Sequence, residues 1–513
     1  MILKNLRWLA VLFLLALSMP GAQCAVRLPR ILSSHMVLQR DRPIHIWGWS
    51  EPSEKVSATL NGASQSTMGD NLGRWSLYLP PQSAGGPFQL TVTGTNQIVL
   101  DDILIGDVWF ASGQSNMEMP LEGFPRSAVV KNAAQEISQA NYPQMRLLVI
   151  PRKASAFPLG DFEARQSWAI CSPETAAKFS AVAYFFGRDI LTREHVPIGL
   201  IDSTWGGTPV EAWLSVDGLS ADASLMPVFA AWARMSDEQQ DAGLSVAAEK
   251  REDEAAIKAN QPVPKHAWHP DPESWDPSWL FNGMVAPAVR YPIKGVIWYQ
   301  GESNSRLDRA AMYDKAFPAL IADWRKHWHE GDFPFLFVQI SSFTSDSTED
   351  WAVIREAQRR TLSVANSGMA VSIDVGDPDN VHPADKQTVG ARLALAARAL
   401  GYHEQIEYSG PLFRETSTEP DSVRVWFDHV ANGLVAKSGP LEGFEVAGDD
   451  HRFVAAEARI DGDSVVVSNA QIQRPKYVRY GWKNVPVVNL YNSADLPASP
   501  FTSEDDIRVS DRP

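Results

Sequence analysis

The fold is decided by a short apolar run that ends in a polar turn, DVWFASGQSNME at residues 107–118. Three later stretches repeat this pattern: IGLIDSTWGGT at residues 198–208, VIWYQGESN at 296–304 and MAVSIDVGDPDNVHP at 369–383. Each apolar run has the length of a buried strand. In an open parallel sheet, ligands bind outside the carboxyl ends of the strands. We therefore expect the four polar clusters to meet at one edge of one sheet.

The segments between these runs have the character of helices. Helix-like patterns cover Ala181 to Arg193, Arg309 to Trp328 and Ala384 to Leu400. Strands that alternate with helices predict an α/β domain, a parallel sheet covered by helices, over residues 103–401. A polar and then proline-rich stretch at about residues 215–280 interrupts it. We interpret this stretch as a helical insertion that ends in an irregular loop over one face.

Both flanks are rich in strand and turn signals. In residues 26–102 the run Val56 to Leu60 is followed by Asn61-Gly62, a strong signal for a tight turn between strands. Strand signals return in residues 402–513, for example in Ser464 to Val467. We therefore predict an N-terminal β-sandwich module and a C-terminal β module on either side of the α/β domain.

The first 25 residues have the charge and hydropathy pattern of a targeting segment. Lys4 and Arg7 precede an apolar run from Trp8 to Leu17, and small residues follow it. This pattern predicts a signal peptide at residues 1–25, and hence a periplasmic or secreted protein. The run is too short to span a bilayer, and no later stretch is long and apolar enough, so we expect no membrane span. Removal of the peptide would leave Cys171 as the single cysteine, which we expect to be a small buried residue.

The charge balance excludes one large class of partners. Lysine and arginine total 46 against 61 acidic residues, which gives a formal charge of −15. Binding to nucleic acid needs a basic face for the phosphates, so we expect no nucleic-acid partner.

The four clusters contain the parts of an acyl-transfer site. Ser115 follows a Gly-Gln pair at a strand-to-helix turn, which would expose its hydroxyl as a nucleophile. Asp379 lies three residues before His382, a spacing at which a carboxylate can orient the imidazole, and Asp377 is the alternative. The sequence thus predicts Ser115, His382 and Asp379 as catalytic residues.

Donors for an oxyanion are also present. The backbone amides of Ser115 and Gly207 are candidates, because glycine lets the backbone approach a ligand closely. Gln300 would add a side-chain amide, with Asn304 as the alternative. The remaining candidates are expected to support loops or to bind substrate: Gln114, Asn116, Trp205, Trp298 and Glu302. Glu302 would either fix the Gln300 loop or assist proton transfer.

Four ordered blocks carry a resemblance to a known family. They are GQSNME at residues 113–118, WGGTPVEAW at 205–213, WYQGESN at 298–304, and His382-Pro383 with the following Lys386. Together they resemble the sialate O-acetylesterase family, which belongs to the SGNH hydrolases and is related to bacterial acetylxylan esterases. The resemblance implies an SGNH-hydrolase-like fold, with an O-acetylated sugar or glycan as substrate and neither a metal nor an organic cofactor.

The implied reaction is ester hydrolysis through an acetyl-enzyme. Ser115 would attack the acetyl carbonyl, His382 would take its proton, and Asp379 would orient His382. We expect activity to fall as His382 is protonated, near the ordinary value of about 6.5 unless Asp379 shifts it.

Two other functions stay open at this point. One is a non-catalytic carbohydrate-binding protein, and the other is a general aryl or lipid esterase. Neither the glycan that carries the acetyl group nor the oligomeric state can be deduced from these residues.

Overall fold

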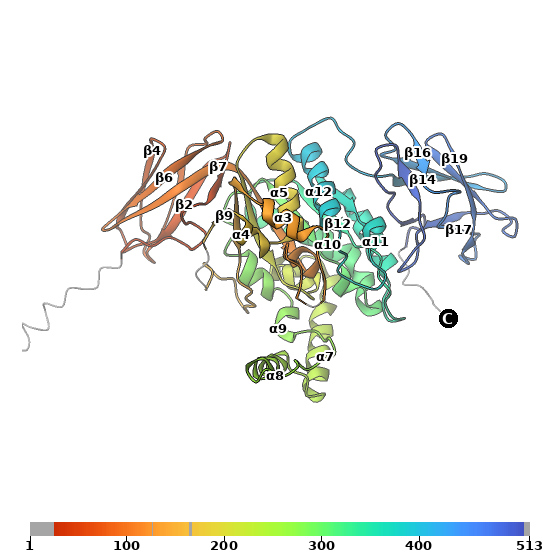
Figure 1. The fold of residues 1–513 in the computed structure, drawn as a ribbon, viewed down its shortest axis with the longest axis horizontal. Helices are drawn as coiled ribbons and strands as arrows, with labels where there is room; N and C mark the ends of the chain where they lie inside the picture. Colours follow the sequence, from red (N-terminus) through yellow and green to blue (C-terminus); the bar gives the residue numbers. More distant parts are fainter. Residues whose placement is uncertain (1–24, 126, 164–166, 507–513) are drawn as a thin grey trace, which may run out of the picture.

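The structure is a computed structural model that describes residues 25–125, 127–163 and 167–506. The predicted signal peptide lies outside these residues except for its last position, and so does Cys24. A mixed α/β region lies between two β-rich regions (Figure 1). Among the residues that the structure describes, no helix combines the length and the apolar character needed to cross a membrane.

The central sheet has the strand order β13-β12-β11-β7-β10-β8-β9. All neighbours in it are parallel except β8 and β9. The bounds, in that order, are Ser367–Val371, Phe335–Gln339, Gly295–Tyr299, Gln97–Gly113, Ile198–Thr204, Tyr142–Val149 and Ala169–Cys171. Cys171 is buried, and burial raises the pKa of its thiol to about 12.

Helices cover both faces of this sheet. Side chains of successive strand residues point to opposite faces. Trp109 of β7 packs edge-on against Phe186 at a ring distance of 5.0 Å, whereas the next residue, Phe110, packs against Trp324 at 5.7 Å. These partners belong to α5 (Ala181–Glu194) and α10 (Leu307–Trp328), which therefore lie on opposite faces. Burial on both faces explains why the strands are continuous apolar runs.

The predicted α/β fold class is confirmed. The three predicted helices are α5, α10 and α12 (Lys386–Gly401), each within two residues of the predicted ends. Helix α12 packs on α5, and α11 (Trp351–Arg360) packs on α10. Shorter helices are α2 (Ser115–Glu118), α3 (Ala133–Gln139) and α4 (Pro173–Ala177).

Strand β7 joins the N-terminal region to the central sheet. Its first half pairs with β6 (Gly85–Thr93) and β1 (Val37–Gln39), and its second half pairs with β10 and β11. The predicted boundary after residue 102 therefore falls inside one strand. The other N-terminal strands are β2 (Ile44–Trp49), β3 (Lys55–Leu60), β4 (Ala63–Met68) and β5 (Arg74–Leu79). Asn61 and Gly62, both with positive φ, form the turn between β3 and β4.

The C-terminal region contains two four-stranded antiparallel sheets with a core of their own. The first is β14 (Leu412–Thr418), β15 (Val423–Asp428), β20 (Ser464–Ser468) and β19 (Glu457–Asp461). The second is β18 (Val454–Ala455), β17 (Phe444–Ala447), β21 (Tyr477–Tyr480) and β23 (Phe501–Thr502). A short pair is formed by β16 (Leu434–Ala436) and β22 (Leu490–Asn492).

A buried arginine ties this region to the α/β domain. Arg355 of α11 donates to the carbonyl oxygens of Ile340 and Ser341, and to those of Lys483 and Asn484. One guanidinium thus bonds backbone on both sides of the contact between the two regions.

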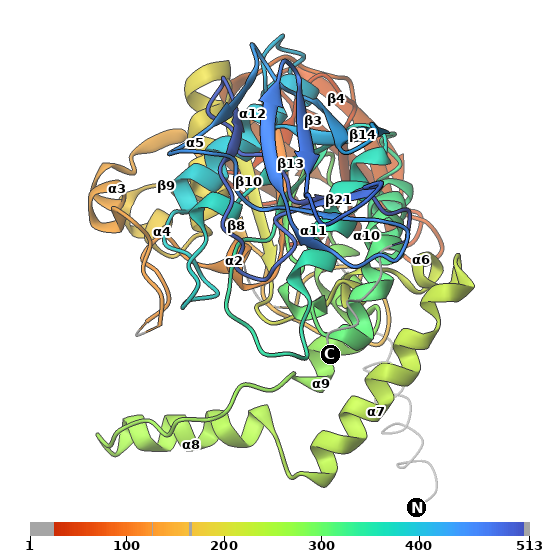
Figure 2. The same ribbon diagram turned by 90° about the vertical axis from the view of Figure 1, so that its right-hand side faces the viewer.

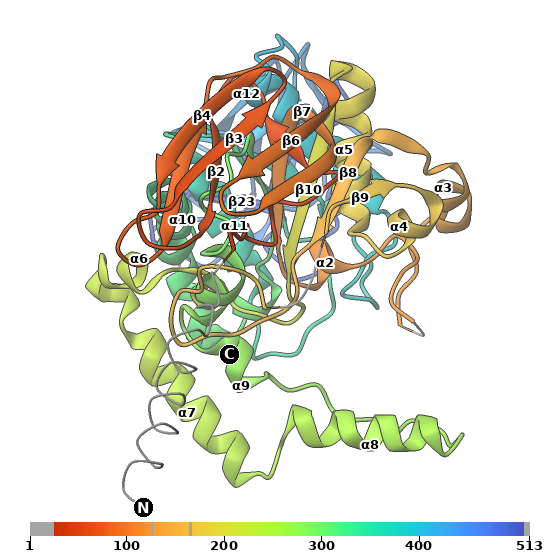
Figure 3. The same cartoon turned by 90° about the vertical axis from the view of Figure 1, so that its left-hand side faces the viewer.

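The insertion projects away from the body of the molecule. It contains α6 (Val216–Ser220), α7 (Pro227–Asp241), α8 (Val246–Lys258) and α9 (Pro272–Trp275). Helices α7 and α8 extend outward, and the chain then returns to α9 beside the domain (Figures 2 and 3). We call residues 227–271 the insertion arm.

Candidate active site

All four polar loops supply residues to one cavity at the carboxyl edge of the central sheet. Its volume is about 450 Å³. The loops contribute Gln114 and Ser115, Gly206 and Gly207, Glu302 and Ser303, and Val381 and His382. The other lining residues are Trp268, Trp275, Arg306, Phe343, Glu349 and Trp351. The parallel sheet thus brings together segments that lie far apart in the sequence.

Ser115 and His382 are in direct contact in this cavity. Ser115 Oγ lies 2.8 Å from His382 Nε2, so the hydroxyl can donate to the neutral imidazole. Ser115 is the first residue of α2, directly after the turn that ends β7. A Cβ on Gly113 would lie 2.2 Å from the Tyr299 carbonyl oxygen, so only glycine allows β7 to pass β11 this closely at the turn.

The surroundings keep His382 neutral. Burial lowers the pKa of His382 to about 4, and the positive charge of Lys386 adds to this effect. The ring of Phe124 packs edge-on against the imidazole at 5.2 Å. At neutral pH the imidazole is therefore available as a base, at a lower pKa than the ordinary value expected from the sequence.

The structure does not bring the predicted carboxylates to His382. Asp379 is exposed, and its backbone N–H donates to Asp377 Oδ1 at 2.9 Å. The backbone N–H of His382 donates to Asn380 Oδ1, also at 2.9 Å. Across the described residues, no hydrogen bond or ion pair joins either aspartate to the imidazole. The polar side chains of this loop instead shape its own turn.

The two backbone oxyanion candidates are free to donate. Neither the Ser115 nor the Gly207 N–H has an acceptor within the part of the chain that the structure describes. The neighbouring Gly206 N–H donates to Glu118 Oε2 at 2.8 Å, so it is not available. Gly207 has φ +73°, and its carbonyl accepts from Trp275 Nε1 at 2.6 Å. This bond fixes the peptide that follows the candidate amide.

Gln300 and Asn304 link the loops through buried hydrogen bonds. Gln300 is fully buried, and its Nε2 donates to the Thr208 carbonyl at 3.1 Å and to Asn304 Oδ1 at 2.7 Å. Asn304 Nδ2 donates to Glu211 Oε2 at 2.9 Å. The side-chain amides of both residues therefore bond protein atoms and line no part of the cavity. Gln114 braces the same region, since its Oε1 accepts from the amides of Gly301 and Ser303.

A buried polar chain lies beneath the serine. Lys386 Nζ donates to Asn116 Oδ1, and Asn116 Nδ2 donates to Glu302 Oε1 at 2.6 Å. Burial lowers the pKa of Lys386 to about 7 and raises that of Glu302. Glu302 Oε2 is buried and has no hydrogen-bond partner in the described structure. The chain ties the Ser115, Glu302 and His382 loops together, because Asn116 also donates to the Val381 carbonyl.

Some of the tryptophans lie in the core, and others lie at the candidate site. Trp298 is fully buried among Trp213, Phe317 and Trp324, away from the cavity. Trp205 is half-buried, with the Arg152 guanidinium 5.8 Å from its ring. Sequence reasoning missed the cavity residues Trp268, Trp275, Arg306 and Phe343. Trp268 and Trp275 had a signal, since both are aromatic residues in the polar, proline-rich stretch of the insertion.

Comparison with known proteins agrees with this fold. A family model described as carbohydrate esterase, sialic acid-specific acetylesterase, matches residues 267–399. The chain is 30% identical to the sialate O-acetylesterase of Rattus norvegicus, over 96% of this chain and 97% of the relative. It is 32% identical to that of Homo sapiens, over 76% of this chain and 74% of the relative.

A solved structure resembles nearly the whole chain. It is a carbohydrate acetylesterase from Xanthomonas citri, with 34% identity and a TM-score of 0.80. The match covers 94% of this chain and all of that one. These relatives and the fold define the class as a carboxylic ester hydrolase of the carbohydrate esterase type. The chain belongs to the sialate O-acetylesterase family.

Proposed function

We propose that the protein removes acetyl groups from sugar hydroxyls, with Ser115 as nucleophile and His382 as general base. The observation that carries this proposal is the 2.8 Å contact between Ser115 Oγ and His382 Nε2 in a cavity built from all four loops. Relatives named as acetylesterases of sialate and of carbohydrates support an acetylated sugar as the substrate class.

The first half of the reaction forms an acetyl-enzyme. Ser115 Oγ attacks the acetyl carbonyl carbon while His382 Nε2 takes the hydroxyl proton. The negative charge on the carbonyl oxygen is stabilised by the free amides of Ser115 and Gly207. When the tetrahedral intermediate collapses, the bond to the sugar oxygen breaks, and His382 gives its proton to that oxygen.

The second half releases acetate. A water molecule gives its proton to His382 and attacks the acetyl carbon, and the bond to Ser115 Oγ then breaks as the serine is reprotonated. Each half starts with neutral His382. The low pKa of this residue maintains that state over the neutral and mildly acidic range.

The role predicted for Asp379 stays a prediction. In this conformation His382 contacts neither Asp379 nor Asp377, so the proposed chemistry uses the serine and the histidine alone. An orienting carboxylate would have to come from a different conformation of the 377–382 loop.

The experiment that tests the proposed function is acetate release by the mature protein from acetylated sialic acid, acetylated xylan and an aryl acetate. Ser115→Ala should reduce kcat by about 10⁴-fold or more, as loss of a nucleophile does. Ser303→Ala is the matched control, because Ser303 lines the same cavity without contacting His382. Equal activity of wild type and Ser115→Ala would place the chemistry elsewhere, and an inert wild type would favour a carbohydrate-binding function.

We further propose that the protein is exported and that residues 1–25 are removed. The basic and then apolar start of the sequence supports this proposal. N-terminal sequencing of the protein from its native cells should find a start near residue 26. An intact Met1 would refute export by this route.

A further inference from the structure

A second cavity adjoins the catalytic one. Its volume is about 370 Å³, and it shares Gly206, Gly207 and Trp268 with the catalytic cavity. One wall is the loop after β10, including Trp205, and the other is the insertion arm with α8 and its return segment. A substrate held at Ser115 can therefore extend past Gly207 into this space.

Trp268 stands between the two cavities. Its side chain is 70% exposed, and every other tryptophan among the described residues is more deeply buried. A Cβ on Gly207 would lie 3.5 Å from the indole, so the ring lies beside the residue that carries the candidate oxyanion amide. Because the indole lines both cavities, it offers apolar surface to a ligand that enters either of them. The apolar C–H face of a pyranose ring packs well on an indole of this kind.

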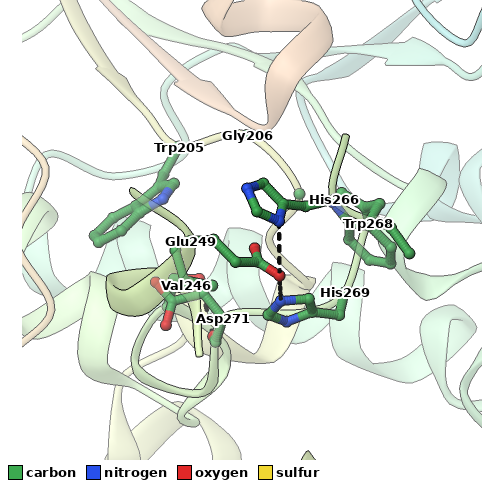
Figure 4. A pocket seen from close by; sticks show the side chains of 11 residues that line it. Trp205, Gly206, Val246, Glu249, His266, Trp268, His269 and Asp271 are labelled. Atoms are coloured by element: carbon green, nitrogen blue, oxygen red, sulfur yellow. Dashed lines mark hydrogen bonds and ion pairs between the residues drawn. The ribbon is translucent and has the colours of Figure 1, made fainter. Parts of the chain in front are cut away.

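The polar groups of this cavity suit hydroxyls. Glu249 lies between two imidazoles, and its Oε1 is 3.1 Å from His269 Nε2 and 3.8 Å from His266 Nδ1 (Figure 4). In the same view Trp205 and Trp268 are on opposite sides of these groups. Carboxylate oxygens accept hydrogen bonds and imidazole nitrogens donate or accept them, and sugar hydroxyls can do both.

The charge of the cavity restricts the kind of sugar. Glu249 and Asp271 line it, and no lysine or arginine does. Two carboxylates with no lysine or arginine beside them in the lining disfavour an acidic sugar. A neutral sugar unit is therefore the ligand that these residues fit.

We propose that this cavity is a subsite for a neutral sugar unit that is glycosidically linked to the acetylated sugar. The enzyme then acts on an oligosaccharide or glycan chain in preference to a free monosaccharide. This inference rests on the proposed function, because the subsite has a role in turnover only if the ester is cleaved at Ser115.

The test compares free and linked forms of the same acetylated sugar. One pair is O-acetylated xylose and xylotriose, the second is O-acetylated sialic acid and sialyllactose, and 4-nitrophenyl acetate serves as an ester without a sugar. For the wild type, kcat/KM should favour the linked member of at least one pair by about tenfold or more, since remote binding energy is used in the transition state.

Two variants locate that preference. Trp268→Ala and Glu249→Ala should each reduce the ratio of linked to free kcat/KM to below about threefold. Ile257→Ala is the matched control, because Ile257 is an exposed residue of α8 outside both cavities, and it should keep the wild-type ratio. Circular dichroism would confirm that all three variants are folded.

Each other result has a definite meaning. If the wild type cleaves the esters without preferring a linked member, or if the variants keep its ratio, the subsite is refuted and the proposed function stands. If the wild type cleaves none of the esters, including 4-nitrophenyl acetate, the proposed function fails and the subsite fails with it.

Discussion

The four polar loops of the candidate active site and the insertion arm differ in how deeply they bury their polar and aromatic residues. In the loops, polar side chains such as Asn116, Gln300 and Asn304 are buried and hydrogen-bonded to one another or to backbone. In the arm, α8 has no buried residue, and Trp268 is largely exposed. Buried networks fix the positions of the loops, whereas the exposed arm offers its side chains to a ligand. Changes in the loops should therefore affect every ester, and changes in the arm only esters of extended sugars.

The largest effect should come from His382→Ala. Without the base, kcat should fall by about 10⁴-fold or more for aryl and sugar acetates alike. Rates of acetate release across the same panel of esters measure this loss. His403→Asn serves as the control, because asparagine tolerates the positive φ of 61° at this surface position. A loss confined to sugar esters would break the division between loops and arm.

The sequence predicted that the four polar loops meet, and the reason is physical. Each polar cluster directly follows a buried strand, and the parallel pairing of β7 with β10 and β11 brings those ends together. The position of Trp268 depends instead on the path of an arm that leaves the domain and returns, which no local pattern specifies. Likewise, the buried position of Gln300 depends on Thr208, Tyr313 and Gln358, which come from other segments. The positions of both residues are therefore set by tertiary contacts, which the local sequence does not specify.

Gly207→Ala should have the next largest effect. Alanine is strained at φ +73°, and its methyl group would lie 3.5 Å from the Trp268 indole, so the candidate oxyanion amide should move. Loss of one such donor lowers kcat by about 10²-fold. Gly243→Ala is a close match for backbone strain, with φ +69° in the arm and no atom near the added methyl group. We expect aryl acetate hydrolysis to fall only for the change at position 207, and equal rates for both variants would remove Gly207 from the site.

A smaller, pH-dependent effect is expected from Lys386→Met. Activity requires neutral His382, so kcat/KM should fall as the pH drops through the pKa of about 4. The Lys386 charge helps to lower this pKa. Removal of this charge should raise the pKa of His382 and shift the acid limb of the pH profile to higher pH. The variant should then lose several-fold more activity near pH 5 than at pH 7.

The control for this shift is Lys131→Met, which removes an exposed lysine that pairs with Asp385 near the same loop. Its pH profile should match that of the wild type. If the acid limb of Lys386→Met stayed in place, the buried chain beneath Ser115 would be structural only.

The smallest effect should come from Asp379→Asn. This variant tests whether an exposed side chain of a polar loop matters less for kcat than the residues inside the cavity. Asp379 lies in one of the four polar loops but is exposed like the arm, and it makes no contact with His382. Screening by water makes such a charge worth little, so we expect kcat to fall less than about fivefold. Asp377→Asn is the companion variant, because Asp377 accepts a hydrogen bond from the Asp379 N–H and shapes the turn.

A large loss at position 379 alone would contradict this expectation. If kcat fell about 10³-fold for Asp379→Asn but not for Asp377→Asn, the loop must rearrange during turnover to place Asp379 against the imidazole. The exposure of that loop would then reflect a resting conformation, and Ser115 and His382 alone would not account for the chemistry.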